Sequence, residues 1–230
     1  MSAFILLVTL LISLPSLLYA QARPPAPPPD TLAAPNRPGW SVDSRTGCWI
    51  WNQNPTPSEV IAWSGSCSPD GRASGRGAVQ WLKDGILAQY VGDMSGGKRN
   101  GTGVFTSANG ERYDGEWRDD KRNGKGVATS PKGDRYEGEW REGMQHGKGV
   151  YTWASGARYE GEWQGNKRNG AGVHTYANGD RYDGEWRDDR PHGSGHAVIR
   201  GVHNVGKWVD GCFKDGDRRG TMERPLSQCP

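Results

Sequence analysis

The feature of this sequence that most constrains its fold is a tandem repeat. The segment YDGEWRDDKRNGKGV at residues 113–127 returns as YEGEWREGMQHGKGV at residues 136–150, a shift of 23 positions. Such a period is typical of repeat architectures, in which each unit buries its apolar face against its neighbours. Five units begin at a tyrosine: Tyr90, Tyr113, Tyr136, Tyr159 and Tyr182.

Each unit combines a strand pattern with two turn signals. Tyr, Gly and Trp stand at alternate positions and therefore share one face of a β-strand. An Asn-Gly or His-Gly pair predicts a turn, Gly-x-Gly-Val predicts a second strand, and a further Gly predicts the turn into the next Tyr. We therefore predict an all-β fold, an elongated single-layer antiparallel ribbon or solenoid of stacked β-hairpins. The turn pairs stand at 100/101, 123/124, 146/147, 169/170 and 192/193.

The repeats lack an aliphatic core. No leucine or isoleucine occurs between Leu87 and Ile199, whereas the chain contains 11 tryptophans. The first unit departs from the pattern, because Met94 stands where the others have Trp. A lone hairpin is at best marginally stable in water. We therefore expect the hairpins to share ring packing along the row.

The segments YEGEW, KRNGKGV and ANGD resemble the MORN repeat family, whose units are 23-residue β-hairpins stacked in a row. The resemblance covers residues 90–195 and, more weakly, 63–88 and 204–211. It implies a binding or scaffolding module without chemistry of its own. In some members it also implies association with phospholipid membranes or dimer formation.

The chain divides into five predicted regions. A repeat array needs terminal units with a face that does not stack, so we expect a cap at each end. The regions are a signal peptide (1–22), a Pro-rich linker (23–38), an N-terminal cap with a degenerate repeat (39–89), five repeats (90–204) and a C-terminal partial repeat and cap (205–230).

The N-terminus predicts export. An apolar run extends from Phe4 to about Leu14, and Ala20-Gln21-Ala22 fits a signal-peptidase site, although the usual basic residues are missing. An uncleaved membrane anchor is the alternative. We expect an extracytoplasmic protein, either periplasmic or secreted.

The four cysteines flank the repeats. In an elongated body only local pairs are within reach, so we predict the disulfides Cys48–Cys67 and Cys212–Cys229. Pairs that join the two ends, a metal site, and free thiols are the alternatives, and no C-x-x-C pair supports the metal site.

The repeated rings are the first candidate surface. We expect them to form the core against glycine backbone, while a partly open stripe would bind a peptide or stack on sugar rings. This aromatic stripe comprises Tyr113, Trp117, Tyr136, Trp140, Tyr159, Trp163, Tyr182 and Trp186.

A basic row is the second candidate surface. Its residues are expected at the hairpin tips, where they would meet anionic lipid headgroups or keep the edge soluble. The row consists of Lys98, Arg99, Lys121, Arg122, Lys167 and Arg168.

The remaining charges alternate along the strands, as in Arg112, Asp114 and Glu116. We expect cross-strand ion pairs rather than a calcium site. The formal charge of +3, from 29 basic and 26 acidic residues, gives no electrostatic footprint for nucleic acid.

No catalytic motif is present, and the repeat accounts for the carboxylates. We therefore predict a non-catalytic scaffold without a cofactor, which binds another protein and could self-associate. The alternative is a binder of anionic phospholipid or cell-envelope glycan.

Overall fold

The structure is a computed structural model of the chain. It describes residues 39–53, 55, 59–215, 218–223 and 225–229. The predicted signal peptide (1–22) and linker (23–38) lie outside the described residues. In the part of the chain that is described, no helix has the length and apolar character needed to cross a membrane.

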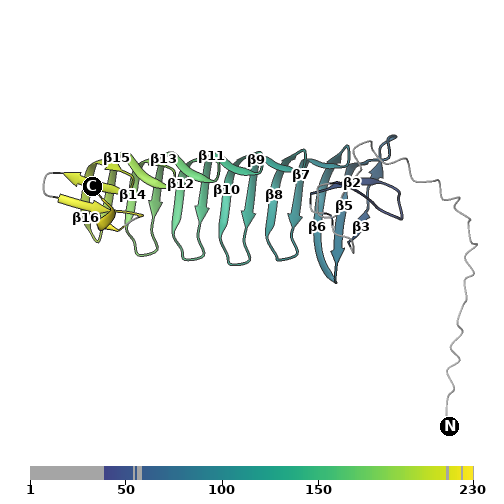
Figure 1. Cartoon of the computed structure of the whole chain (residues 1–230), viewed down its shortest axis with the longest axis horizontal. Coiled ribbons are helices and arrows are strands. Elements are labelled where there is room, and N and C mark those ends of the chain that lie inside the picture. The colour runs from purple at the N-terminus through teal and green to yellow at the C-terminus, as the bar shows by residue number, and fades with distance from the viewer. Residues whose placement is uncertain (1–38, 54, 56–58, 216–217, 224, 230) are drawn as a thin grey trace, which may run out of the picture.

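The fold is an elongated ribbon of consecutive antiparallel hairpins, which confirms the predicted fold class (Figure 1). A two-stranded sheet pairs β1 (Gly39–Val42) with β2 (Trp49–Asn52). Within the described residues, the 16-stranded sheet contains β3 (Val60–Trp63), β4 (Ser66–Cys67), β5 (Ala73–Lys83), β6 (Ile86–Ser95), β7 (Lys98–Thr106), β8 (Arg112–Arg118), β9 (Lys121–Thr129), β10 (Arg135–Arg141), β11 (Met144–Thr152), β12 (Arg158–Gln164), β13 (Lys167–Thr175), β14 (Arg181–Arg187), β15 (Arg190–Ile199), β16 (Val202–Val209), β17 (Cys212–Asp215) and β18 (Arg218–Thr221).

The Asn-Gly and His-Gly pairs do not form the hairpin turns, and that part of the prediction is wrong. The turn between β8 and β9 is Asp119–Asp120, whose φ angles of 48° and 66° fit a two-residue hairpin turn. Asn123 and Gly124 lie inside β9, where its pairing with β8 shifts register. Left-handed glycine suits a β-bulge as well as a turn, so the pair marks a bulge here.

A glutamate of the repeat fills this bulge. The Glu116 carboxylate accepts a hydrogen bond from the Lys125 backbone N–H at 2.8 Å. A Cβ at Gly124 would lie 2.6 Å from that carboxylate, so only glycine fits. Glu139 and Glu185 accept the same bond in their own units.

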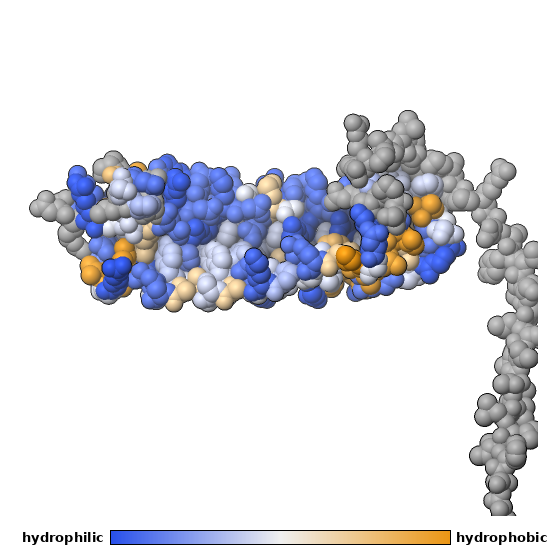
Figure 2. All heavy atoms as spheres, turned by 60° about the horizontal axis from the view of Figure 1, so that its bottom comes forward, coloured by the Kyte–Doolittle hydropathy of each residue, from blue (hydrophilic) through white to orange (hydrophobic). Residues whose placement is uncertain are grey.

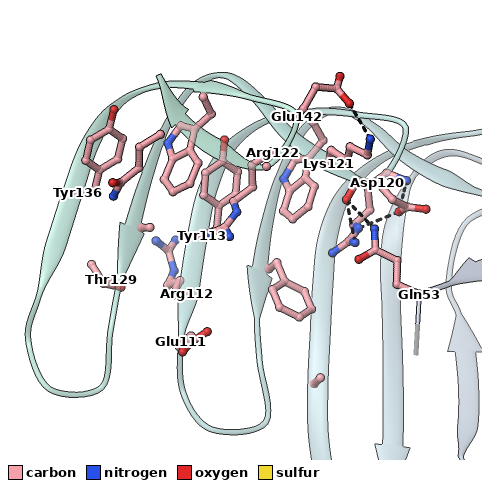
Figure 3. Close-up of a pocket in the computed structure, with 18 of the residues that line it drawn as sticks. Gln53, Glu111, Arg112, Tyr113, Asp120, Lys121, Arg122, Thr129, Tyr136 and Glu142 are labelled. Carbon is pink, nitrogen blue, oxygen red and sulfur yellow. Dashed lines mark hydrogen bonds and ion pairs between the residues drawn. The ribbon is translucent and has the colours of Figure 1, made fainter. Parts of the chain in front are cut away.

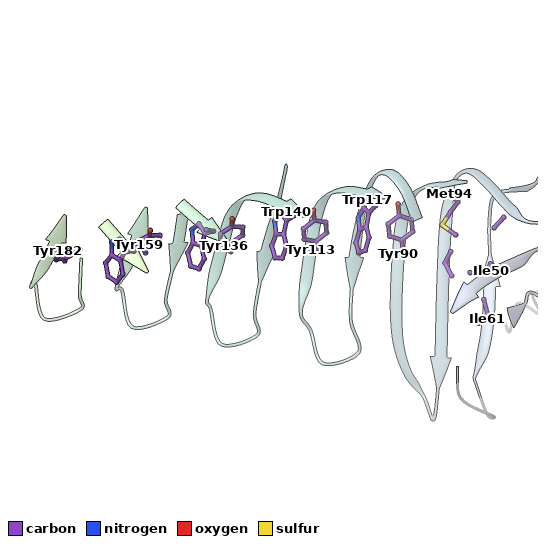
Figure 4. Packing of buried hydrophobic residues seen from close by; sticks show 14 of the residues in the cluster. Ile50, Ile61, Tyr90, Met94, Tyr113, Trp117, Tyr136, Trp140, Tyr159 and Tyr182 are labelled. Atoms are coloured by element: carbon purple, nitrogen blue, oxygen red, sulfur yellow. The ribbon is translucent and has the colours of Figure 1, made fainter. Parts of the chain in front are cut away.

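The core of the repeats is a row of rings (Figure 4). Tyr113 packs edge-to-face on Trp117 of its own unit, with 5.0 Å between ring centroids, and on Trp140 of the next unit at 5.3 Å. Its ring covers Gly126, where a Cβ would lie 2.3 Å from the tyrosine Oη. Trp117 Nε1 donates to the Gly103 carbonyl at 3.0 Å. Edge-to-face contacts and satisfied polar atoms thus replace aliphatic packing.

The N-terminal cap continues this packing. The Trp63 ring covers Gly65 and Gly77 as the tyrosines cover the glycines of the repeats. The β1–β2 hairpin joins the array where the Trp51 backbone N–H donates to the Gly97 carbonyl at 2.8 Å. The cap therefore stacks on the first repeat.

The C-terminal cap closes the other end. Phe213 of β17 packs on Trp208 with ring centroids 5.2 Å apart. The Met222 backbone N–H donates to the Gly211 carbonyl at 2.8 Å, and the Met222 side chain is buried. The segment after β18 therefore folds back onto the array.

One disulfide ties each cap. Cys48 bonds to Cys67 and Cys212 bonds to Cys229, which confirms the predicted local pairs. Each bridge closes a short loop, which restricts the unfolded chain at the ends of the array.

Candidate binding groove

The ring-bearing face of the sheet carries a groove of about 1110 Å³ beside the N-terminal cap. Trp51 and Gln53 of the cap form one wall, and Gln53 Nε2 donates to the Asp120 carbonyl at 3.3 Å (Figure 3). From this wall the lining extends along the repeats as far as Tyr151 and Asn166. The groove thus spans several units rather than one.

The floor of the groove comes from a row that sequence reasoning missed. Phe105, Ala128 and Tyr151 follow the Gly-x-Gly-Val segments at 23-residue spacing, and each lies partly buried against the core. They face the ring side because each pairs with a repeat tyrosine, as Phe105 and Ala128 do with Tyr113. Residue type does not reveal this floor row, because it changes from unit to unit. The 23-residue period is the signal that would have revealed it.

Beyond the groove, the C-terminal cap occupies the same face. Glu223 Oε1 accepts hydrogen bonds from Tyr176 Oη at 2.7 Å and from Arg168 Nη1 at 3.1 Å, and lies 3.5 Å from His174 Nδ1. Burial alone would raise the pKa of Glu223, but its contacts with His174, Arg168 and Tyr176 lower that pKa to about 2. An ionised carboxylate therefore holds the cap on the repeats.

The predicted aromatic stripe lies beneath the surface. Burial raises the pKa of Tyr113, and Trp140 is only 5% exposed. The rings therefore support the groove from below and offer little of their own surface to a ligand. The buried rings are Tyr113, Trp117, Tyr136, Trp140, Tyr159, Trp163, Tyr182 and Trp186.

The arginines of the predicted basic row turn inward. They are the second residues of β7, β9 and β13 rather than loop residues, which corrects their expected position. Each guanidinium lies over a tryptophan ring, at 4.2 Å for Arg99, 4.4 Å for Arg122 and 4.3 Å for Arg168. Because these cations stack on the core, they belong to the groove side of the sheet.

The lysines of the row have partners within the chain. Lys98 Nζ lies 5.2 Å from the centre of the Trp51 ring. Lys121 pairs with Glu142 at 2.6 Å, and Lys167 pairs with Asp188 at 3.0 Å. The two ion pairs offset the positive charge of Lys121 and Lys167 at the turn edge.

The alternating charges pair along a strand instead of across strands, which corrects the prediction. Arg112 contacts Asp114 at 2.8 Å on β8, because the residues opposite them on β9 are Thr129 and Val127. Equivalent pairs recur on β10, β12 and β14. Hydrophilic residues cover most of the repeats in Figure 2, whereas apolar residues gather near the ends. Across the described chain, no group of three or more His, Cys, Asp or Glu could hold a metal.

Comparison with known proteins agrees with this geometry. The family model described as MORN repeat matches five consecutive segments: 90–112, 113–135, 136–158, 159–181 and 182–197. A search of curated proteins found no match. The matched segments begin at the same tyrosines as the repeats of the sequence, and residues 90–197 of the chain are therefore MORN repeats.

Proposed function

We propose that this chain is a non-catalytic protein-interaction scaffold that works outside the cytoplasm and binds an extended segment of a partner protein in the groove. The observation that carries the proposal is the groove itself. It runs across several repeats, from the wall at Trp51 and Gln53 towards the cap segment at Glu223. An elongated site of this kind suits a polypeptide better than a compact metabolite.

The lining of the groove supports a protein ligand. Aromatic side chains of the floor row lie beside polar groups of the turn edge, such as Gln145 and Asn166. Protein interfaces combine such aromatic contacts with a polar rim. The groove therefore has both the apolar floor and the hydrogen-bonding edge that a peptide needs.

The two disulfides support the compartment. Disulfides persist in oxidising compartments and are rare in the cytosol. The pairs Cys48–Cys67 and Cys212–Cys229 therefore favour a periplasmic or secreted location.

We favour a protein partner over an anionic lipid or glycan surface. The arginines of the basic row stack on the core, and Lys121 and Lys167 pair with carboxylates. Screened and paired surface charges attract an anionic surface weakly.

Site-specific photocrosslinking tests the proposal. A photoreactive residue replaces Gln145, which lines the groove and lies opposite Trp140, or Glu137, which is exposed and belongs to the outer pair on β10. The expected result in native cells is a protein adduct from position 145 only, and an adduct with a second copy would assign self-association. Equal adducts at both positions, or lipid adducts alone, would contradict the proposal.

A further inference from the structure

The arginines of the groove side occupy equivalent places in three repeats. Each is the second residue of its strand, and its carbonyl accepts a hydrogen bond from the turn of the next repeat. The donors are the backbone N–H groups of Asp120 to Arg99 at 3.1 Å, Gly143 to Arg122 at 2.9 Å, and Asp189 to Arg168 at 3.1 Å. The second turn residue of one unit therefore always lies beside the arginine of the preceding unit.

At two of the three places this turn residue supplies a carboxylate. Asp120 Oδ1 accepts from Arg99 Nε at 2.8 Å, and the Asp120 carbonyl accepts from Arg99 Nη2 at 3.0 Å. Asp189 binds Arg168 in the same way, with Nε to Oδ1 at 3.1 Å and Nη2 to the carbonyl at 2.7 Å. Both guanidinium groups are thus neutralised by their own chain.

Arg122 lacks this partner because the turn residue is Gly143. Among the described residues, no carboxylate forms an ion pair with Arg122 and no acceptor receives a hydrogen bond from its guanidinium. Figure 3 shows Arg122 beside Tyr113, with dashed lines joining other pairs such as Lys121 and Glu142. The side chain is half-buried and lines the groove. Burial lowers the pKa of Arg122, and the neighbouring Tyr113 and Glu111 only partly offset this decrease.

The chain itself shows what such a guanidinium binds. At Arg168 the Nη1 group, which Asp189 leaves free, lies 2.8 Å from His174 Nδ1 and donates to the carboxylate of Glu223, which belongs to a segment that folds onto the same face. Met222, the residue before Glu223 in the sequence, is buried in the core. This fold therefore already pairs an arginine that is stacked on an aromatic ring with a carboxylate of an overlying segment.

We propose that Arg122 binds a carboxylate of the partner segment in the groove, so that the scaffold selects acidic sequences. A guanidinium fixed over Trp140 offers parallel N–H donors, which suit the two oxygens of a carboxylate. The inference rests on the proposed function for its ligand class, a polypeptide. The acid is either a side chain or a free chain terminus, and the two differ in the test below.

The test is an NMR titration of the full chain with three tetrapeptides based on residues 220–223. The first is acetyl-Gly-Thr-Met-Glu-amide, the second replaces Glu with Gln, and the third carries Gln with a free terminal carboxylate. The first should bind about tenfold more tightly than the second, since hydrogen bonds to charged groups are the strong ones. If the third binds as well as the first, Arg122 accepts a terminal carboxylate as readily as a side chain. If the third binds like the second, Arg122 recognises only the side-chain carboxylate.

Two variants assign the effect to Arg122. Arg122→Gln should remove the preference for acidic peptide, whereas Arg141→Gln, an exposed cation outside the groove, should keep it. Gly143→Asp should also remove the preference while raising the melting temperature. Its φ of 86° resembles that of Asp120 at 66°, a Cβ at Gly143 meets nothing within 4 Å, and the new carboxylate would occupy Arg122.

The inference is overturned if the unmodified chain does not prefer either acidic peptide over the neutral one. It is also overturned if that preference survives in Arg122→Gln. Failure of the proposed function looks different, because a preference that depends on Arg122 would then coexist with an absence of protein adducts from position 145. Conversely, protein adducts together with equal binding of the acidic and neutral peptides would support the scaffold role and contradict the proposed selectivity for acidic sequences.

Discussion

Gly126 shows how a single residue determines the packing of a repeat. Its missing side chain leaves room for the Tyr113 ring, and a Cβ there would lie 2.3 Å from Tyr113 Oη and 2.5 Å from Cζ. The rigid ring, wedged against Trp117 and Trp140, has little freedom to move away. Glycine is therefore required at this position for space.

The substitution Gly126→Ala should lower the free energy of unfolding by about 2 kcal/mol, since overpacking of a rigid core is costly. Denaturant titration would measure the change. Gly220→Ala is the control, because a Cβ there meets only ordinary contacts at 3.8 Å. Equal stability of the two variants would show that the ring yields more easily than the packing indicates.

The strand itself could be predicted at the residue scale. Tyr113 and Trp117 are an even number of positions apart, so they share a face in any regular strand. This parity is independent of tertiary contacts.

The bulge is the element that gives each hairpin its register. Glu116 of β8 accepts a hydrogen bond from the Lys125 backbone N–H of β9, and this contact takes up the extra residues of β9. Asn-Gly alone could not reveal the bulge, because a left-handed glycine serves a turn and a bulge equally well. The true turn, Asp119–Asp120, depends on the tolerance of aspartate for left-handed backbone.

Removing the carboxylate tests this function of the bulge. Glu116→Ala leaves the backbone N–H of Lys125 without its partner and should destabilise the chain by about 1.5 kcal/mol. Thermal and denaturant unfolding would measure the loss. Glu137→Ala, which removes only an exposed ion pair on β10, should change stability by less than about 0.5 kcal/mol. A larger loss of stability in Glu137→Ala than in Glu116→Ala would show that the ion pairs of the outer face matter more than the bulge contact.

At the scale of the whole molecule, the caps close the two ends of the array, and the N-terminal cap forms one wall of the groove. Gln53 contacts Asp120 at one side, and Glu223 contacts Arg168, 55 residues earlier, at the other. These contacts join segments outside the repeat to units within it. The period of the sequence therefore could not predict them, whereas the disulfides could be predicted from the elongated shape.

The Glu223 contact should make the stability of the chain depend on pH. Its folded pKa of about 2 lies below the ordinary value of 4.5, so its stabilisation is complete above about pH 4.5 and is lost as pH falls towards 2. Unmodified chain should melt at a higher temperature than Glu223→Gln at pH 6, and the difference should vanish near pH 2. Melting curves across this range test the effect, with Glu160→Gln, an exposed pair member, as control. A difference that does not change with pH would mean that the side chain acts by packing alone.

The floor row varies from unit to unit, whereas the residues that form the core of the repeats are nearly constant. Phe105, Ala128 and Tyr151 differ in size although they occupy equivalent positions, while the rings and glycines beneath them are nearly constant. The chain therefore tolerates exchange at one position per 23 residues with the scaffold unchanged. Under the proposed function, point substitutions in this row would change the binding preference one subsite at a time and would leave the core intact.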